Sequence, residues 1–264
     1  SDKIEEVQIQ NLADSRIEES KIKELNQLSV SYNKMLERLQ DAFEVQRQFT
    51  ANAAHELRTP LSLIQVQLDL YNSTRHPGND TDTLQTIKMV TEQNDRLGKM
   101  VKTLLDMSEL QTVGRDDVIM VNALVDEVLA DLEPLAQEKN IKLIGKCTDI
   151  RMIGSDILIY RMVYNLVENA IKYNHSGGRV TVTAYQKEKH IYLSIEDTGN
   201  GIPEELRQRV FEPFFRVDKS RSRELGGVGL GLALVHEIVS AHDGTITVRS
   251  NPSGGTIFDV SFTQ

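Results

Sequence analysis

Residues 1 to about 48 contain neither proline nor glycine, so nothing in this stretch interrupts a helix. Apolar residues within it recur at alternating intervals of three and four, which is the spacing of a helix-pairing seam. The seam consists of Leu25, Leu28, Tyr32, Met35, Leu39 and Ala42. A short heptad run is also compatible with an amphipathic helix that packs on its own chain.

The seam continues to about Tyr71, after which residues 72–82 (NSTRHPGNDTD) collect proline, glycine and cap-forming side chains. That composition indicates a turn. Apolar positions resume from Thr83, so we expect an antiparallel hairpin of two long helices. Because one hairpin buries both apolar stripes poorly and two hairpins bury them together, the sequence predicts a homodimeric four-helix bundle.

The pattern changes at residues 114–117, where glycine and aspartate interrupt the helical periodicity. Beyond this point we expect three helices, five strands and a long loop at about 197–228 that has the length of a functional lid. Asn122 and either Ser155 or Asp156 are the expected caps of the first two helices. We place the helices at about 122–139, 155–173 and 230–241, and the strands at 142–147, 179–185, 191–196, 245–249 and 256–262. Helices over one face of a mixed sheet form an α/β sandwich.

The predicted fold class is therefore multidomain, α and α+β, with a coiled-coil segment (1–45), a helical hairpin (46–112) and an α/β domain (113–264). The net charge of −9 argues against direct nucleic-acid binding. Cys147 is the only cysteine, which excludes an internal disulfide. No run approaches the roughly 20 apolar residues that cross a bilayer. If the natural protein is membrane-bound, its spanning segment lies outside this sequence.

A proline falls inside the long predicted helix, at the end of the motif HELRTP. Pro60 removes an amide donor and clashes with the carbonyl of Glu56, so we expect a kink. A histidine followed by a carboxylate just before a kink suggests an exposed nucleophile. Glu56 can polarise one ring nitrogen of His55 and leave the other free to attack a phosphorus. Arg58 and Thr59 complete the cluster, with Thr59 one helical turn after His55; a lone helical histidine is otherwise more often structural.

A second cluster more than a hundred residues downstream suits a nucleotide. Asn165 and Asn169 are four residues apart in NLVENAIKY, so their amides lie on one helix face. Neutral amide oxygens can ligate a Mg²⁺ ion that bridges phosphates. Lys172, about one turn further along, can reach a phosphate. Taken alone, the pair is more typical of an ordinary polar helix face than of a metal site.

The segment EDTGNGI places an aspartate at the end of a predicted strand. Asp197 can accept a hydrogen bond from an adenine amino group, while Gly199 and Gly201 permit close backbone approach. The same residues also favour a simple turn.

The segment GGVGLGLAL places four glycines immediately before a predicted helix, which is typical of an anion site. It is neither a Rossmann fingerprint nor a Walker A loop, and a flexible hinge is the alternative. The glycines are Gly226, Gly227, Gly229 and Gly231. Positive charge in the same lid comes from Arg216, Lys219, Arg221 and Arg223.

Together these motifs resemble those of bacterial two-component sensor histidine kinases. HELRTP resembles the H box, NLVENAIKY the N box, DTGNGI the first glycine box, FEPFFR the F box and GGVGLGLAL the second glycine box. GGTIF, at residues 254–258, is similar to the last block of the catalytic domain. The blocks occur in the order and spacing of the family and cover about residues 49–262. The segment IKELNQLSVSYNKMLERLQ is similar to the second helix of a HAMP signal relay.

The resemblance implies a dimerisation and phosphotransfer hairpin, followed by an ATP-binding domain of the gyrase, chaperone and histidine-kinase type. It implies ATP-dependent autophosphorylation of one histidine, then transfer to an aspartate of a response-regulator receiver domain, with ATP and Mg²⁺ as cofactors. By position, the implied roles are phosphoacceptor for His55, assisting acid for Glu56, regulator dephosphorylation for Thr59, Mg²⁺ ligation for Asn165 and Asn169, phosphate contact for Lys172, adenine stacking for Tyr173 and adenine recognition for Asp197.

The resemblance also implies that the chain is the cytoplasmic part of a bacterial plasma-membrane sensor. Two departures from the family pattern are Asn174, where a small hydroxyl residue is common after KY, and Asp243, where glycine is common. Two alternatives stay open. A dimeric scaffold would bind ATP only structurally, and an ATPase of the gyrase type would let water attack the γ-phosphate and leave the HELRTP cluster without a role.

Overall fold

The computed structural model describes residues 23–73, 80–110, 112–217 and 228–263. The chain forms two compact units that divide between Leu61 and Ser62. Within the described ranges, no helix combines the length and the apolar character that crossing a membrane requires.

Among the described residues, two long helices precede the C-terminal domain. Helix α2 spans Lys23–Ser73 and helix α3 spans Asp80–Glu109. The helix α2 continues through Pro60 to Ser73, so the proline does not end it. The hydroxyl groups of Tyr71 and Thr83, 3.1 Å apart, join the end of α2 to the start of α3 as a hairpin requires. Most of the predicted turn, residues 74–79, lies outside the described residues.

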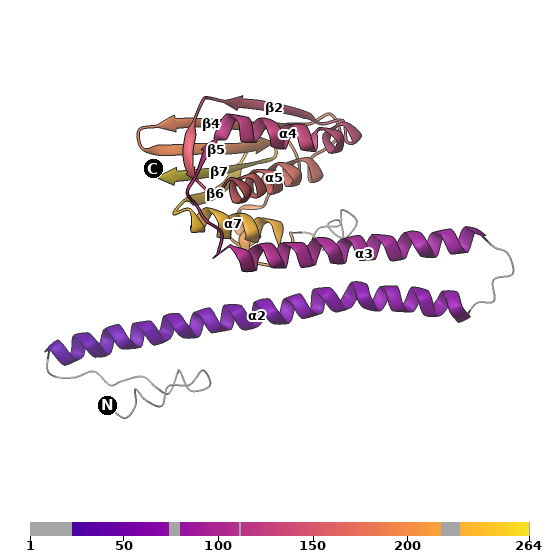
Figure 1. Ribbon diagram of the computed structural model, residues 1–264, viewed down its shortest axis with the longest axis horizontal. Coiled ribbons are helices and arrows are strands. Elements are labelled where there is room, and N and C mark those ends of the chain that lie inside the picture. The colour runs from indigo at the N-terminus through magenta and orange to yellow at the C-terminus, as the bar shows by residue number, and fades with distance from the viewer. Residues whose placement is uncertain (1–22, 74–79, 111, 218–227, 264) are drawn as a thin grey trace. The chain divides into compact units, whose positions relative to one another are not determined.

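A five-stranded mixed sheet forms the centre of the C-terminal domain, with the strand order β2-β4-β5-β7-β6. Strands β2 and β4 are parallel, and every other neighbouring pair is antiparallel. Three helices, α4, α5 and α7, cover one face of the sheet (Figure 1). The strands are β2 (Lys142–Cys147), β4 (Arg179–Lys187), β5 (His190–Asp197), β6 (Thr245–Ser250) and β7 (Thr256–Thr263), and the helices are α4 (Val121–Glu138), α5 (Asp156–Lys172) and α7 (Gly231–Ala241). These elements confirm the predicted α/β sandwich.

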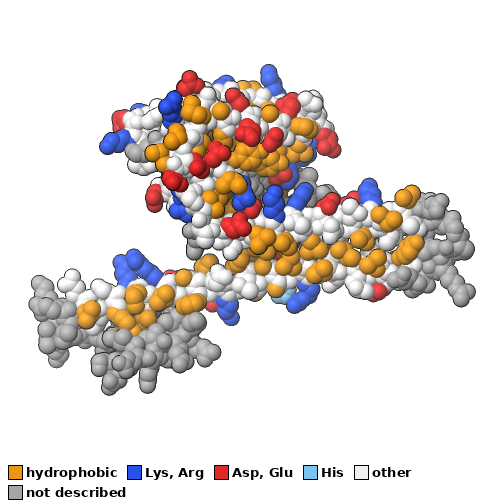
Figure 2. Space-filling model, viewed as in Figure 1, with side chains coloured by type: hydrophobic (Ala, Val, Ile, Leu, Met, Phe, Trp, Pro, Cys, Tyr) orange, Lys and Arg blue, Asp and Glu red, His pale blue; other side chains and the backbone are white. Residues whose placement is uncertain are grey.

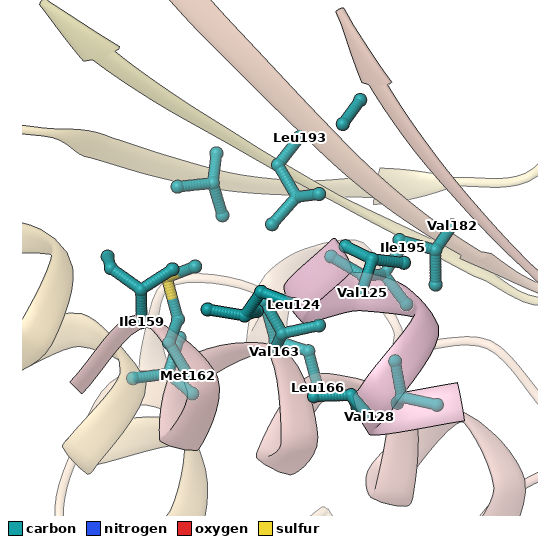
Figure 3. Close-up of a cluster of buried hydrophobic side chains, with 14 of the residues drawn as sticks. Leu124, Val125, Val128, Ile159, Met162, Val163, Leu166, Val182, Leu193 and Ile195 are labelled. Carbon is teal, nitrogen blue, oxygen red and sulfur yellow. The ribbon is translucent and has the colours of Figure 1, made fainter. Parts of the chain in front are cut away.

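The core lies between the sheet and its helices. Alternate residues of β5 are buried, as the period of two in its sequence predicts. Leu193 and Ile195 point from this strand toward Val163 and Leu166 of α5 (Figure 3). Each such side chain contributes about 1.5–3 kcal/mol when it is fully buried. This packing fixes the ends of α5 and β5, and both ends carry predicted site residues.

The structure differs from the sequence prediction in three details. The described part of the predicted loop contains two short 3₁₀ helices, η2 (Glu204–Leu206) and η3 (Arg209–Phe211). Strands β1 (Asp117–Met120) and β3 (Arg151–Gly154) form a small antiparallel sheet that was not predicted. The prediction that Asn122 caps α4 is wrong, because the helix already begins at Val121. The Val121 amide donates to the Ile150 carbonyl (3.0 Å), so a neighbouring segment satisfies the helix entry.

The end of α3 packs with the α/β domain. Leu110 is buried in the same core cluster as the sheet and helices. Arg161 of α5 forms an ion pair with Asp106 of α3, with Nη1 and Oδ1 2.9 Å apart. Arg115 also donates to the Leu110 carbonyl (2.8 Å).

Candidate functional site

The HELRTP motif occupies consecutive turns of α2. His55, Arg58 and Thr59 are exposed, Glu56 is half-buried and Pro60 is buried. The Thr59 hydroxyl donates to the His55 carbonyl (3.1 Å), an ordinary contact for a threonine within a helix. The imidazole can therefore be approached from solvent, as a nucleophile must be.

The two asparagines of the N box lie on α5, and the first residue of α7 lies beside them. A Cβ added to Gly231 would come within 2.8 Å of Asn165 Oδ1 and within 4.0 Å of Asn169 Nδ2. Asn165 donates its Nδ2 to the Arg161 carbonyl (2.8 Å), which leaves Oδ1 beside Gly231. The second glycine box and the N box, distant in sequence, therefore meet at one place.

The segment before α7 is held in a conformation that suits glycine. Gly229 has a φ of +79°, and its carbonyl accepts a hydrogen bond from the Phe214 amide (2.8 Å). An added Cβ would lie 2.8 Å from the Phe215 carbonyl oxygen. Leu230 precedes the helix, and its aliphatic side chain cannot accept a hydrogen bond from the first amides of α7. These amides and the helix dipole therefore suit an anion. The predicted Gly227 lies outside the described residues, as do Gly226, Lys219, Arg221 and Arg223.

Asp197 ends β5 and is 8% exposed. Its Oδ1 accepts hydrogen bonds from the backbone amides of Gly199 (2.8 Å) and Thr256 (3.1 Å). Burial raises the pKa of this carboxyl, and the two amide donors oppose that rise. A side chain at Gly255, whose φ is +98°, would overlap the backbone of Asp197. Gly201, at a φ of +72°, faces Gly255 from the other side of this turn.

Tyr173 and Lys172 end α5. Tyr173 is 41% exposed. Partial burial raises the pKa of its hydroxyl, and the positive charge of Arg216 opposes this rise. The Lys172 ammonium lies 2.7 Å from Glu168 Oε2, one turn earlier on the same helix. This ion pair already engages the Lys172 ammonium within its own helix.

Gly231 lies beside Asn165 and Asn169, and Gly229 precedes it by two residues. Tyr173, Asp197, Gly199 and Gly201 gather at the adjoining ends of α5 and β5. The contacts of the Thr256 amide and Gly255 with Asp197 were not predicted from the sequence. The glycine pair in GGTIF was the one local sign that a backbone approaches closely there. Through the described part of the chain, no three His, Cys, Asp or Glu side chains group as metal ligands. Amide oxygens such as those of Asn165 and Asn169 are hard oxygen atoms of the kind that Mg²⁺ accepts as ligands.

Comparison with known proteins gives two family matches. Residues 45–113 match the His Kinase A (phospho-acceptor) domain. Residues 154–264 match the histidine kinase-, DNA gyrase B- and HSP90-like ATPase family.

Individual relatives agree with these matches. The sensor histidine kinase RppB of Synechocystis sp. is 35% identical over 226 residues, which are 83% of this chain and 49% of RppB. The solved structure of the histidine kinase AdeS of Acinetobacter baumannii has a TM-score of 0.64 and 27% identity, covering 79% of this chain and 97% of AdeS. The histidine kinase ThkA, solved in complex with response regulator protein TrrA, shares the fold, with a TM-score of 0.68, 23% identity and coverage of 92% of this chain and 68% of that one. The chain spans about half the length of the curated relatives that it matches.

Proposed function

Because this chain belongs to the sensor histidine kinases, we propose that it transfers the γ-phosphoryl group of ATP to His55 and then to an aspartate of a response regulator. The observation that carries the proposal is the meeting of Gly231, at the start of α7, with Asn165 and Asn169 of α5. The same chain carries an exposed histidine followed by a carboxylate in a phosphoacceptor domain. A nucleotide site and a nucleophile are the two parts that such a transfer needs.

The nucleotide binds with its base between Tyr173 and Asp197. The Asp197 carboxylate accepts a hydrogen bond from the adenine amino group, and the buried setting strengthens that bond. The phosphates lie at the start of α7, where Gly229 and Gly231 let the backbone approach them. Asn165 and Asn169 would hold Mg²⁺, which would supply positive charge to neutralise part of the phosphate charge.

In the first step, a ring nitrogen of His55 attacks the γ-phosphorus in line with the bond to the β–γ bridging oxygen. The N–P bond forms as that P–O bond breaks, and ADP leaves with the electron pair. Glu56 holds the proton of the other ring nitrogen and accepts it as the ring gains a phosphoryl group. Arg58, exposed two residues further along α2, adds positive charge near the incoming phosphate.

In the second step, a carboxylate oxygen of the regulator attacks the same phosphorus. The N–P bond breaks and leaves its electron pair on the ring nitrogen, while Glu56 returns the proton to the other ring nitrogen. A response regulator as partner is supported by the family and by ThkA, a protein of this fold that was crystallised with one. We also propose that the chain dephosphorylates its regulator. The Thr59 hydroxyl, which donates to the His55 carbonyl, keeps lone pairs that can accept a bond from the attacking water.

A second copy of the chain covers the apolar side of the hairpin. Large apolar side chains stay exposed along the helices of the single chain, and Figure 2 shows them in a row. They include Val66 and Leu70 of α2 and Ile87, Val101 and Leu105 of α3. An exposed apolar stripe of this length marks an interface, so we propose that the hairpin dimerises as a four-helix bundle.

The three-part division at residues 45/46 and 112/113 is likewise a proposal, with the first part acting as a signalling helix. We propose further that the chain is the cytoplasmic part of a plasma-membrane sensor, because the curated relatives are named sensor kinases and are about twice as long. The spanning segment would then belong to the longer protein.

The test is incubation with γ-labelled ATP and Mg²⁺, comparing the parent with His55→Gln. His190→Gln is the matched control, since His190 opens β5 at the end opposite Asp197. We expect an acid-labile, base-stable label on the parent and the control and no label on His55→Gln. A label that His55→Gln retains would refute the assignment. Phosphate release that proceeds undiminished in His55→Gln, with no label on any protein, would favour the gyrase-type ATPase.

A further inference from the structure

Asn174 follows the last turn of α5 directly after Tyr173, and its side chain is half-buried. Its Oδ1 accepts hydrogen bonds from the His175 amide (3.0 Å) and the Thr198 hydroxyl (3.2 Å). Its Nδ2 donates to the Arg179 carbonyl (3.1 Å). The amide group is thus engaged at both ends by the protein itself.

These contacts close a ring between three elements. The Thr198 hydroxyl accepts a hydrogen bond from the Arg179 amide (3.0 Å), so Asn174, Thr198 and Arg179 each contact the other two. They stand at the end of α5, the end of β5 and the start of β4, respectively. Gly178 is buried against the ring, and any side chain there would overlap the Asn174 amide.

The ring has one candidate base-binding residue on each side of it. Tyr173 immediately precedes Asn174, and Asp197 immediately precedes Thr198. The two backbones are also in direct contact, because the Asn200 amide donates to the Tyr173 carbonyl (3.3 Å). A Cβ on Gly199 would come within 2.5 Å of that carbonyl oxygen. The ring and this backbone contact together connect the segment that carries Tyr173 to the segment that carries Asp197.

We propose that Asn174 is a positioning residue that tunes adenine affinity, holding Tyr173 and Asp197 at the separation that the base requires. This inference rests on the proposed nucleotide site. A small hydroxyl residue at this position has a single polar atom. It cannot accept from Thr198 and donate to Arg179 through two separate atoms, as the asparagine amide does.

The experiment measures the dissociation constants of ATP and ADP by calorimetry, with and without Mg²⁺, for the parent, Asn174→Ala and Asn174→Ser. Asn122→Ala is the matched control, since it removes an asparagine hydrogen bond to Asp149 at the start of α4. We expect Asn174→Ala to bind both nucleotides roughly tenfold more weakly, as loss of one to two net hydrogen bonds implies. Asn174→Ser, which keeps one bond, falls in between, and the control matches the parent.

Two features distinguish positioning from mere structural support. The loss is equal for ATP and ADP and independent of Mg²⁺, because it concerns the base and not the phosphates. The autophosphorylation rate at saturating ATP stays at the parent value. A lower melting temperature with unchanged dissociation constants would overturn the inference, as would a loss confined to Mg²⁺–ATP. If the parent and Asn174→Ala bind ATP equally well, this inference alone is wrong. If the parent binds no ATP, the proposed function is wrong as well.

Discussion

Replacing Asp197 by asparagine separates nucleotide recognition from stability. Asp197→Asn keeps the size of the side chain, and its amide oxygen can still accept from the Gly199 and Thr256 amides. What it removes is the negative charge that, in the proposed nucleotide site, accepts from the adenine amino group. A hydrogen bond to a charged group contributes about 1.5–3 kcal/mol, so the variant should bind ATP about 10- to 150-fold more weakly.

The stability of the same variant should not fall. Burial raises the pKa of Asp197 in the folded protein, so the folded state disfavours its charged form. That cost is fully present above the folded pKa and is relieved as the pH falls through it, because the folded state then binds the proton more readily than the unfolded chain. At neutral pH Asp197→Asn removes the cost, and its melting temperature should equal or exceed that of the parent.

Isothermal titration with ATP and thermal unfolding monitored by circular dichroism measure the two quantities on the same preparations. The affinity of the parent should also weaken as the pH falls through the raised pKa, because a protonated carboxyl accepts poorly. Asp197→Asn should lack this pH dependence. Unchanged ATP affinity, or an affinity loss that accompanies a large drop in melting temperature, would refute the reasoning.

Gly231→Ala should weaken Mg²⁺-dependent ATP binding, because the added Cβ would come within 2.8 Å of Asn165 Oδ1. Gly98→Ala, in an open part of α3, is its control: ATP titration should show no change, and unfolding should show a gain of about 0.5–1 kcal/mol. The pKa of His242 is lowered by burial, and its Nε2 accepts from the Ser155 amide (3.0 Å). The stabilisation that neutral His242 gives the folded protein is fully present above the ordinary histidine pKa. It is lost as the pH falls through the lowered pKa of His242 in the folded state. His242→Gln should therefore lose less stability than the parent between pH 7 and pH 5 in urea titrations, and an equal loss would contradict this explanation.

Regular periodicity allowed most of the fold to be predicted. The alternation of Ile191, Leu193 and Ile195 identified β5, and all three side chains are buried. Strands β1 and β3 have only four residues each, which is too short for such a pattern, and they depend on a pairing between distant segments. The start of α4 was misplaced for a related reason, because a non-local carbonyl, that of Ile150, accepts from its first amide.

The site could be predicted wherever the signal is local. A pair of asparagines four residues apart must share a helix face, and Asp197 with its glycines forms a recognisable turn. The Thr256 amide that contacts Asp197 is 59 residues away along the chain, so no local sequence pattern predicts this hydrogen bond. The pairing of Lys172 with Glu168 is local, but it was not predicted. An ammonium can pair with a phosphate or with a carboxylate, and the sequence analysis assigned Lys172 to a phosphate.

The most direct test of the central claim is to locate the phosphate on the chain. After incubation with ATP and Mg²⁺, trypsin digestion and mass spectrometry at alkaline pH resolve the peptide QFTANAAHELR, which runs from Gln48 to Arg58 and contains His55 as its single histidine. The proposed mechanism predicts one acid-labile phosphate on this peptide. Phosphate on any other peptide, or an acid-stable phosphate on Thr50, would contradict it.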